Sequence, residues 1–168
     1  TIHFAETHDN NRLASVSTPY AKLRTSLCAL FSVCGGFGFA NGVEWFATQK
    51  IDVHESGSLN WGAPINQVDH IARLNRILTT HPAFFGHTRL SLIQTNQSQC
   101  LVLFRHNQAY DKKLLILVNL DCENFQPASW ETGKTGIQDT CLHDLLSNKQ
   151  IETKDLKPDT PGSDNRGP

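Results

Sequence analysis

The sequence predicts an α/β region followed by an all-β region. Two observations predict the first part: apolar, strand-like runs at residues 1–5 and 37–40, and a helical pattern between them. A strand, a helix and a second strand within about 40 residues form a βαβ unit with parallel strands. The third observation is a change after Gly86, where runs rich in Leu, Ile and Val alternate with polar turns, as in antiparallel sheets.

The first helix is predicted at residues 17–33, "STPYAKLRTSLCALFSV". Thr18 is a suitable N-cap, and Pro19 is a favoured first helical residue. Apolar side chains recur at helical spacing and predict one buried stripe, made of Tyr20, Leu23, Leu27, Leu30 and Phe31. Two glycines then end the helix before the second strand.

A second helix is predicted after a long loop. Residues 44–62 show little periodicity, and a loop of this length in a compact domain is usually functional. Pro64 is expected to open the helix and Pro82 to close it. The packed side of this helix is predicted to contain Ile65, Val68, Ile71, Ala72, Leu74 and Leu78.

The all-β part is predicted to begin near residue 88. The runs "RLSLIQTN", "CLVLFRHN" and "KLLILVNL" are spaced like an antiparallel meander, and a weaker strand pair is expected around residues 137–142 and near Ile151. The last residues, rich in Pro, Gly and Asp, are predicted to be disordered. The predicted division is therefore residues 1–87, 88–155 and a tail at 156–168.

Composition argues against several functions. A net charge of -1 disfavours a general nucleic-acid binder, and no apolar run approaches the roughly 18 residues of a membrane span. Five scattered Cys without a CxxC pair disfavour a disulfide framework and a zinc site, and favour a reducing, cytoplasmic compartment. Because the chain lacks Met and Thr1 lies inside a predicted strand, we expect a fragment of a longer protein.

A dense polar cluster follows the first predicted strand. Residues 4–12 read "FAETHDNNR", with Glu6, His8, Asp9 and Arg12 within seven positions. Functional groups gather at the carboxyl ends of parallel strands, so the cluster is a candidate site. The alternative is a solvated polar loop in which Asp9 or a neighbouring Asn caps a turn.

The second strand ends in a similar position. Gly42 allows close approach of a ligand or of another backbone, and Trp45 can either stack on a sugar ring or fill the core. Asp52 and His54 in the long loop are weak evidence for a metal, because one His and one Asp do not make a ligand set. No metal site and no cofactor are predicted.

The polar cluster carries a resemblance. "FAETHDNNR" resembles the fourth conserved region of the α-amylase superfamily of glycoside hydrolases, a pattern close to F-x-E-N-H-D followed by an Arg, with Thr7 in place of the usual Asn. "GFANGVEWF" looks like the eighth barrel strand of that family, and "LNRILTTHPAFF" like its last barrel helix. "HDLLSNKQI" is similar to its "DLLSG" segment, with Asn148 replacing the Gly. The resemblance extends to about residue 155.

This resemblance implies a fold and an activity. Residues 1–87 would be the last two βα units of a catalytic (β/α)8 barrel, and residues 88–155 would be the antiparallel β-sandwich called domain C. The parent enzyme would hydrolyse or transfer α-glucosidic bonds of glycogen, starch or malto-oligosaccharides by a retaining mechanism. The amino-terminal part of the barrel would be its structural partner; no nucleic acid or membrane is involved.

The resemblance also assigns roles to single residues. Asp9 would be the third carboxylate of the site, which stabilises the transition state. His8, Glu44 and Trp45 would bind substrate, while Glu6 and Arg12 would support the site. The nucleophile and the acid/base belong to earlier regions of the family that this sequence does not contain, so the chain alone is expected to be inactive.

Two other interpretations stay open. One is a non-catalytic carbohydrate-binding or interaction module on the same scaffold, and the other is an unrelated α/β enzyme with a chance His-Asp pair. The choice between hydrolysis and transfer also stays open. Because two βα units cannot close a barrel of eight, apolar faces are expected to lie open at Phe4, Leu27, Phe31, Phe37 and Phe39.

Overall fold

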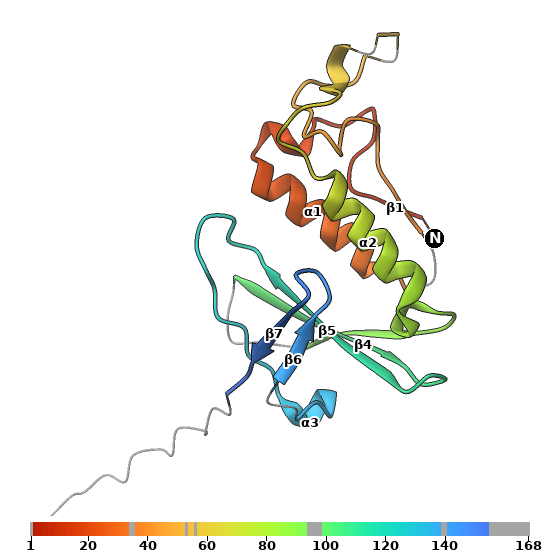
Figure 1. The fold of residues 1–168 in the computed structure, drawn as a ribbon, viewed down its shortest axis with the longest axis vertical. Helices are drawn as coiled ribbons and strands as arrows, with labels where there is room; N and C mark the ends of the chain where they lie inside the picture. The colour runs from red at the N-terminus through yellow and green to blue at the C-terminus, as the bar shows by residue number, and fades with distance from the viewer. Residues whose placement is uncertain are drawn as a thin grey trace, which may run out of the picture. The chain divides into compact units, whose positions relative to one another are not determined.

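The computed structural model describes residues 2–33, 36–52, 54–55, 57–93, 99–138 and 141–154. The chain divides into two compact units, residues 1–137 and residues 138–168 (Figure 1). The boundary predicted near residue 87 stays a prediction, and the predicted tail at 156–168 lies outside the described residues. In the described part of the chain, no helix is long and apolar enough to cross a membrane.

The first unit begins with a parallel strand pair. β1 (His3–Phe4) lies beside β2 (Phe37–Gly38), which confirms the parallel pairing predicted from the βαβ pattern. Both strands are only two residues long, shorter than the predicted runs. The Phe4 ring packs on the backbone of Gly38, where an added Cβ would lie 2.6 Å from a ring carbon.

The helix between these strands is α1 (Thr18–Phe31). Its N-cap is Ser17, not the predicted Thr18: the Ser17 hydroxyl accepts a hydrogen bond from the Tyr20 N–H at 3.2 Å. The extended backbone of Ser17 (φ -169°, ψ 157°) turns its hydroxyl toward the first helical turn. Thr18 is therefore the first helical residue, and Pro19 is the second.

The buried face of α1 differs in part from the predicted stripe. Of that stripe, only Leu30 is buried, and Phe31 is exposed. Smaller side chains fill the rest of the buried face: Ala21, Thr25 and Ala29. Among the apolar faces expected to lie open, Phe4 and Phe31 are exposed, whereas Leu27, Phe37 and Phe39 are half-buried.

The second long helix is α2 (Val68–Thr80), which lies beside α1 (Figure 1). It starts later than predicted, because Asn66 forms a turn in which its side-chain oxygen accepts from the Val68 N–H at 3.2 Å. Its buried side chains are Ile71, Leu74 and Ile77. The predicted Ile65, Val68 and Ala72 are exposed and Leu78 is half-buried, so the packed face is narrower than the sequence pattern indicates.

The predicted meander is confirmed. β3 (Arg89–Ile93), β4 (Cys100–Asn107) and β5 (Lys112–Asn119) form an antiparallel sheet in the order β3-β4-β5. Short helical segments accompany these elements: 3-10 turns at Leu13–Ser15, Gly57–Leu59 and Pro82–Phe84, and α3 (Thr132–Thr135).

The second unit contains a hairpin of β6 (Cys141–Asp144) and β7 (Lys149–Glu152), the weaker pair that the sequence predicts. Asn148 in its turn has φ 58°, a left-handed conformation that Gly adopts freely and Asn tolerates. The described sheets have two, three and two strands, so the barrel and the β-sandwich stay predictions.

A buried arginine links α1 to the meander. Arg105 on β4 has no exposed surface, and its Nη2 donates to the carbonyl oxygens of Leu30 and Ser32 at the end of α1. Its Nη1 donates to Thr88 Oγ1 at 2.8 Å, and its guanidinium lies 4.2 Å from the centre of the Phe84 ring. Burial lowers the pKa of Arg105 to about 10, so the group stays charged at neutral pH beside a helix carboxyl end, where a cation is favourable.

Replacing Arg105 with Met should lower the free energy of unfolding by roughly 3 kcal/mol, because several buried carbonyl groups lose their donor. Urea unfolding measures this change. Arg76→Met on the exposed side of α2 is the matched control and should stay within about 0.5 kcal/mol of wild type. Equal effects of the two substitutions would show that Arg105 does not link α1 to the sheet.

The contact between α1 and α2 should make stability depend on pH. His70 Nε2 lies 2.6 Å from Ser26 Oγ, and burial, with smaller effects of Lys22 and Arg73, lowers the pKa of His70 to about 4. In the unfolded chain the pKa of a His is near 6.5, so between pH 6.5 and pH 4 the unfolded chain binds more protons than the folded chain. The contribution of His70 to the free energy of unfolding is therefore complete above about pH 6.5 and is lost as the pH falls toward 4.

His70→Gln should flatten this dependence. Between pH 7 and 4, the wild-type chain should lose on the order of 1 kcal/mol more unfolding free energy than the variant, after allowance for partial solvent exposure. Urea unfolding at several pH values tests the difference. Parallel pH profiles for the two chains would contradict the assignment to His70.

Candidate functional site

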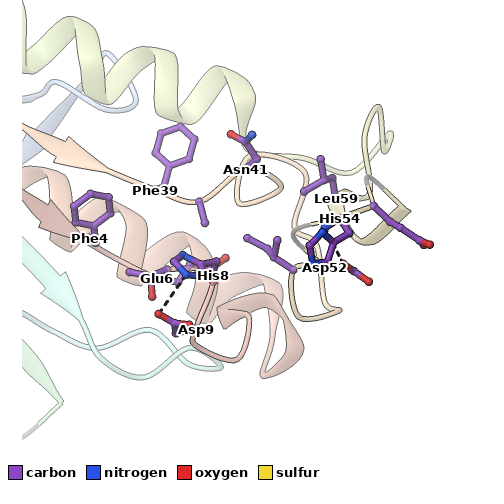
Figure 2. A pocket seen from close by; sticks show the side chains of 13 residues that line it. Phe4, Glu6, His8, Asp9, Phe39, Asn41, Asp52, His54 and Leu59 are labelled. Atoms are coloured by element: carbon purple, nitrogen blue, oxygen red, sulfur yellow. Dashed lines mark hydrogen bonds and ion pairs between the residues drawn. The ribbon is translucent and has the colours of Figure 1, made fainter.

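An open pocket lies at the carboxyl ends of β1 and β2 (Figure 2). Its volume is about 840 Å³, and its lining comes from three segments: the residues after β1, the residues after β2, and the long loop between positions 51 and 59. Of the polar cluster of the sequence, Glu6, His8 and Asp9 line this pocket, at the position where parallel strands present functional groups, and Arg12 does not.

His8 and Asp9 form a pair in the lining of this pocket. His8 Nε2 lies 3.4 Å from Asp9 Oδ2, and the two side chains are 62% and 80% exposed (Figure 2). A carboxylate beside an imidazole, both open to solvent, can accept and donate hydrogen bonds to a ligand with several hydroxyl groups.

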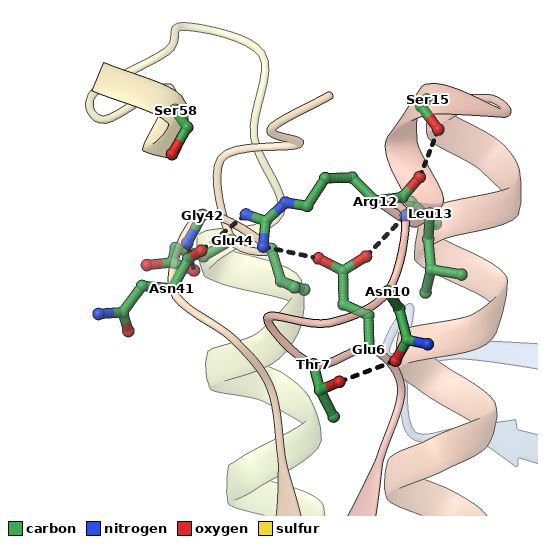
Figure 3. A network of polar contacts seen from close by, with 12 residues as sticks. Glu6, Thr7, Asn10, Arg12, Leu13, Ser15, Asn41, Gly42, Glu44 and Ser58 are labelled. Atoms are coloured by element: carbon green, nitrogen blue, oxygen red, sulfur yellow. Dashed lines mark hydrogen bonds and ion pairs between the residues drawn. The ribbon is translucent and has the colours of Figure 1, made fainter. Parts of the chain in front are cut away.

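Glu6 and Arg12, which flank this pair in the sequence, are buried and point toward each other (Figure 3). Arg12 Nη1 lies 3.0 Å from Glu6 Oε1, and the Leu13 N–H donates to Glu6 Oε2 at 2.6 Å. Arg12 Nη2 also donates to the carbonyl oxygen of Asn41 at 2.6 Å, in the segment after β2. Arg12 thus joins the two segments that line one side of the pocket.

The hydrogen bond from Arg12 to the Asn41 carbonyl oxygen requires a glycine at position 42. Its φ is 95°, and a Cβ at this position would clash with the Arg12 guanidinium and lie 2.9 Å from the Leu59 carbonyl oxygen. The close approach predicted at Gly42 is therefore made by the Arg12 side chain and the Leu59 backbone of the same chain.

Glu44 and Trp45 do not line the pocket that contains His8 and Asp9. Glu44 Oε2 accepts a hydrogen bond from the Gly42 N–H at 3.0 Å, so its carboxylate stabilises its own turn. The Trp45 ring lies 5.7 Å from the Trp61 ring, between centroids, and Trp61 is 75% exposed. The substrate-binding roles of Glu44 and Trp45 stay predictions.

The pocket contains side chains that the sequence did not assign. Asn41 and Glu55 lie in its lining, together with Asp52 and His54, which the sequence marks only as weak metal candidates (Figure 2). The long aperiodic loop is the sequence feature that indicates a role for this region. In the described ranges, no three or more His, Cys, Asp and Glu side chains are grouped so as to hold a metal.

Arg12→Met should lower the free energy of unfolding by about 3–5 kcal/mol, because the buried Glu6 carboxylate loses its cation. Adding Glu6→Gln to this variant should restore part of the loss. Urea unfolding of the single and double variants measures both effects.

The exposed pair Lys134–Glu131, 2.9 Å apart, is the control for this experiment. Glu131→Gln should change stability by less than about 1 kcal/mol. If Arg12→Met cost no more than this control, the buried pair would not hold the two segments together.

Comparison with protein-family models, with curated proteins and with solved structures finds no match for the chain.

Proposed function

We propose that the chain is the carboxyl-terminal part of an α-amylase-type enzyme. In this proposal residues 1–87 are the last two βα units of its barrel and residues 88–155 its domain C. The enzyme acts on α-glucosidic bonds of glycogen, starch or malto-oligosaccharides by a retaining mechanism. The observation that supports this best is the exposed His8–Asp9 pair in a pocket at the carboxyl ends of parallel strands.

The geometry suits a carboxylate that stabilises a transition state. A retaining glycosidase passes through a state with positive charge on the sugar ring, and a fixed negative charge nearby lowers its energy. Asp9 supplies this charge and also accepts hydrogen bonds from sugar hydroxyls. His8, within 3.4 Å of Asp9, donates to a hydroxyl beside it.

In this proposal Glu6 and Arg12 hold the segment that carries His8 and Asp9 in place and do not contact the substrate. Both Glu6 carboxylate oxygens have a partner, Arg12 on one side and the Leu13 N–H on the other. This occupied and buried carboxylate is poorly suited to attack a sugar or to transfer a proton. The nucleophile and the acid/base are therefore proposed to come from the amino-terminal part of the barrel.

The alternative is a carbohydrate-binding module without catalysis, and one observation favours it. Trp61 is largely exposed and lies beside Trp45, with the two ring planes inclined at 43°, and an exposed indole ring offers an apolar face on which a sugar ring can stack. Upstream sequence separates the alternatives, because an enzyme needs an Asp and a Glu at the ends of earlier strands.

Asp9→Asn in the longer protein that carries this chain should lower kcat on malto-oligosaccharides by about a hundredfold or more, since a transition-state charge is lost. kcat/KM should fall by at least the same factor, because Asp9 also accepts hydrogen bonds from the hydroxyl groups of the bound substrate. The release of reducing ends measures both constants.

Asp52→Asn is the matched control, because Asp52 is a carboxylate in the same pocket but outside the resembling motif. It should change kcat far less. Near-normal turnover by the Asp9→Asn variant would contradict the proposal. Cleavage by residues 1–168 alone, abolished by Asp9→Asn, would also contradict it, because the nucleophile and the acid/base would then lie in this chain.

A further inference from the structure

Three basic side chains stand in a row across the β3-β4-β5 sheet. In the strand register Arg89 pairs with His106, and His106 pairs with Lys113. Directly opposite residues lie on the same face, and strands about 4.8 Å apart place the Arg89 and Lys113 Cα atoms about 10 Å from each other. Long side chains at these positions can reach one ligand.

These three side chains line a cavity of about 480 Å³. This volume is typical of small-molecule sites, which range over about 300–1,000 Å³. Lys134 on α3 adds a further cation to the lining, and Ser91 and Phe104 add a hydroxyl group and an aromatic ring. Among the described residues, the lining includes no Asp and no Glu. The described lining therefore carries an excess of positive charge from Arg89, Lys113 and Lys134, although the whole chain has a net charge of -1.

The counter-charges around this cavity are few. Lys134 pairs with Glu131 at 2.9 Å, and His106 Nε2 lies 3.7 Å from Asp111, whose side chain is 90% exposed. Among the described residues, neither Arg89 nor Lys113 forms an ion pair with a carboxylate. Arg89 and Lys113 lie on the same face, one strand apart from each other on either side of His106, so an anion bound between them would be attracted by both cations.

The position of the Lys113 ammonium group depends on the absence of a side chain at Gly136. The Lys113 Nζ would lie 3.0 Å from a Cβ added at Gly136, the residue that ends α3 with φ 63°. Since no side chain occupies this position, the ammonium group lies beside the end of α3 at the cavity wall, while the Lys113 side chain stays exposed.

We propose that this cavity binds a small phosphorylated compound, with its phosphate between Arg89 and Lys113. The planar guanidinium of Arg matches two phosphate oxygens, while Lys supplies a compact second charge. The Phe104 ring gives an apolar surface for a cyclic group attached to the phosphate, and Ser91, its partner in the strand register, gives a hydroxyl beside it. Within the part of the chain that the structure describes, this site shares no lining residue with the pocket of His8 and Asp9, and the proposal does not depend on the proposed function.

Calorimetric titration of residues 1–168 with inorganic phosphate, glucose 6-phosphate and glucose tests the proposal. Both phosphate compounds should bind and glucose should not. Tighter binding of glucose 6-phosphate would assign the site to a phosphate ester that contacts Phe104, whereas equal affinity would assign it to free phosphate and overturn the Phe104 contact.

Substitutions locate the binding site. Arg89→Gln and Lys113→Gln should each weaken phosphate binding about tenfold or more, because each removes a charge-assisted contact. Lys112→Gln is the matched control: Lys112 precedes Lys113 on β5, so its side chain points to the opposite face, and the change in net charge is the same. All three side chains are exposed, so each variant should keep the dispersed NMR spectrum of the folded chain.

Two results would overturn the proposal. The first is that the wild-type chain binds neither phosphate compound. The second is that Lys112→Gln weakens binding as much as Lys113→Gln, because binding would then follow overall charge and not this cavity.

Discussion

The buried ion pair between Arg12 and Glu6 holds the candidate site together. The two residues lie at the ends of a loop, so their pairing at 3.0 Å closes it, and His8 and Asp9 lie on the closed segment. The same guanidinium donates to the Asn41 carbonyl oxygen, which fixes the segment after β2 to the segment after β1. Gly42 must lack a side chain for this contact to exist. The buried Glu6–Arg12 pair thus gives the loop that carries the exposed His8–Asp9 pair a defined position.

A second buried arginine acts at the other end of α1. Arg12 lies just before the helix, paired with a carboxylate, whereas Arg105 on β4 meets the carbonyl oxygens at the helix end and has a ring stacked on its guanidinium. One charge is neutralised by an opposite charge, and the other by the dipoles of a helix end. Each arginine also donates to backbone carbonyl oxygens: Arg12 joins the segments after β1 and β2, and Arg105 joins the end of α1 to the meander.

The sequence predicted the features that depend on local pattern: the parallel strand pair, both helices, the three-stranded meander, and the polar cluster at a strand end. It failed where geometry depends on a single turn or on distant partners. Ser17 rather than Thr18 is the N-cap because of one extended backbone conformation. The hydrogen bond of Glu44 with the Gly42 N–H is likewise not specified by a local pattern, and the substrate-binding role of Glu44 stays a prediction. Arg105 lies in an apolar strand run, and its role depends on residues more than 70 positions away, which no local pattern specifies.

Amide hydrogen exchange tests most directly whether the buried Glu6–Arg12 pair holds the segments after β1 and β2 together. The Leu13 amide donates to Glu6, and the Ala47 amide donates to Gly42 at 2.9 Å in the turn beside Arg12. In the Arg12→Met variant, both amides should lose protection together, while those of Val102 and Leu103 in β4 should keep it. Faster exchange at Leu13 with unchanged exchange at Ala47 would contradict the account, because the two segments would then be held independently.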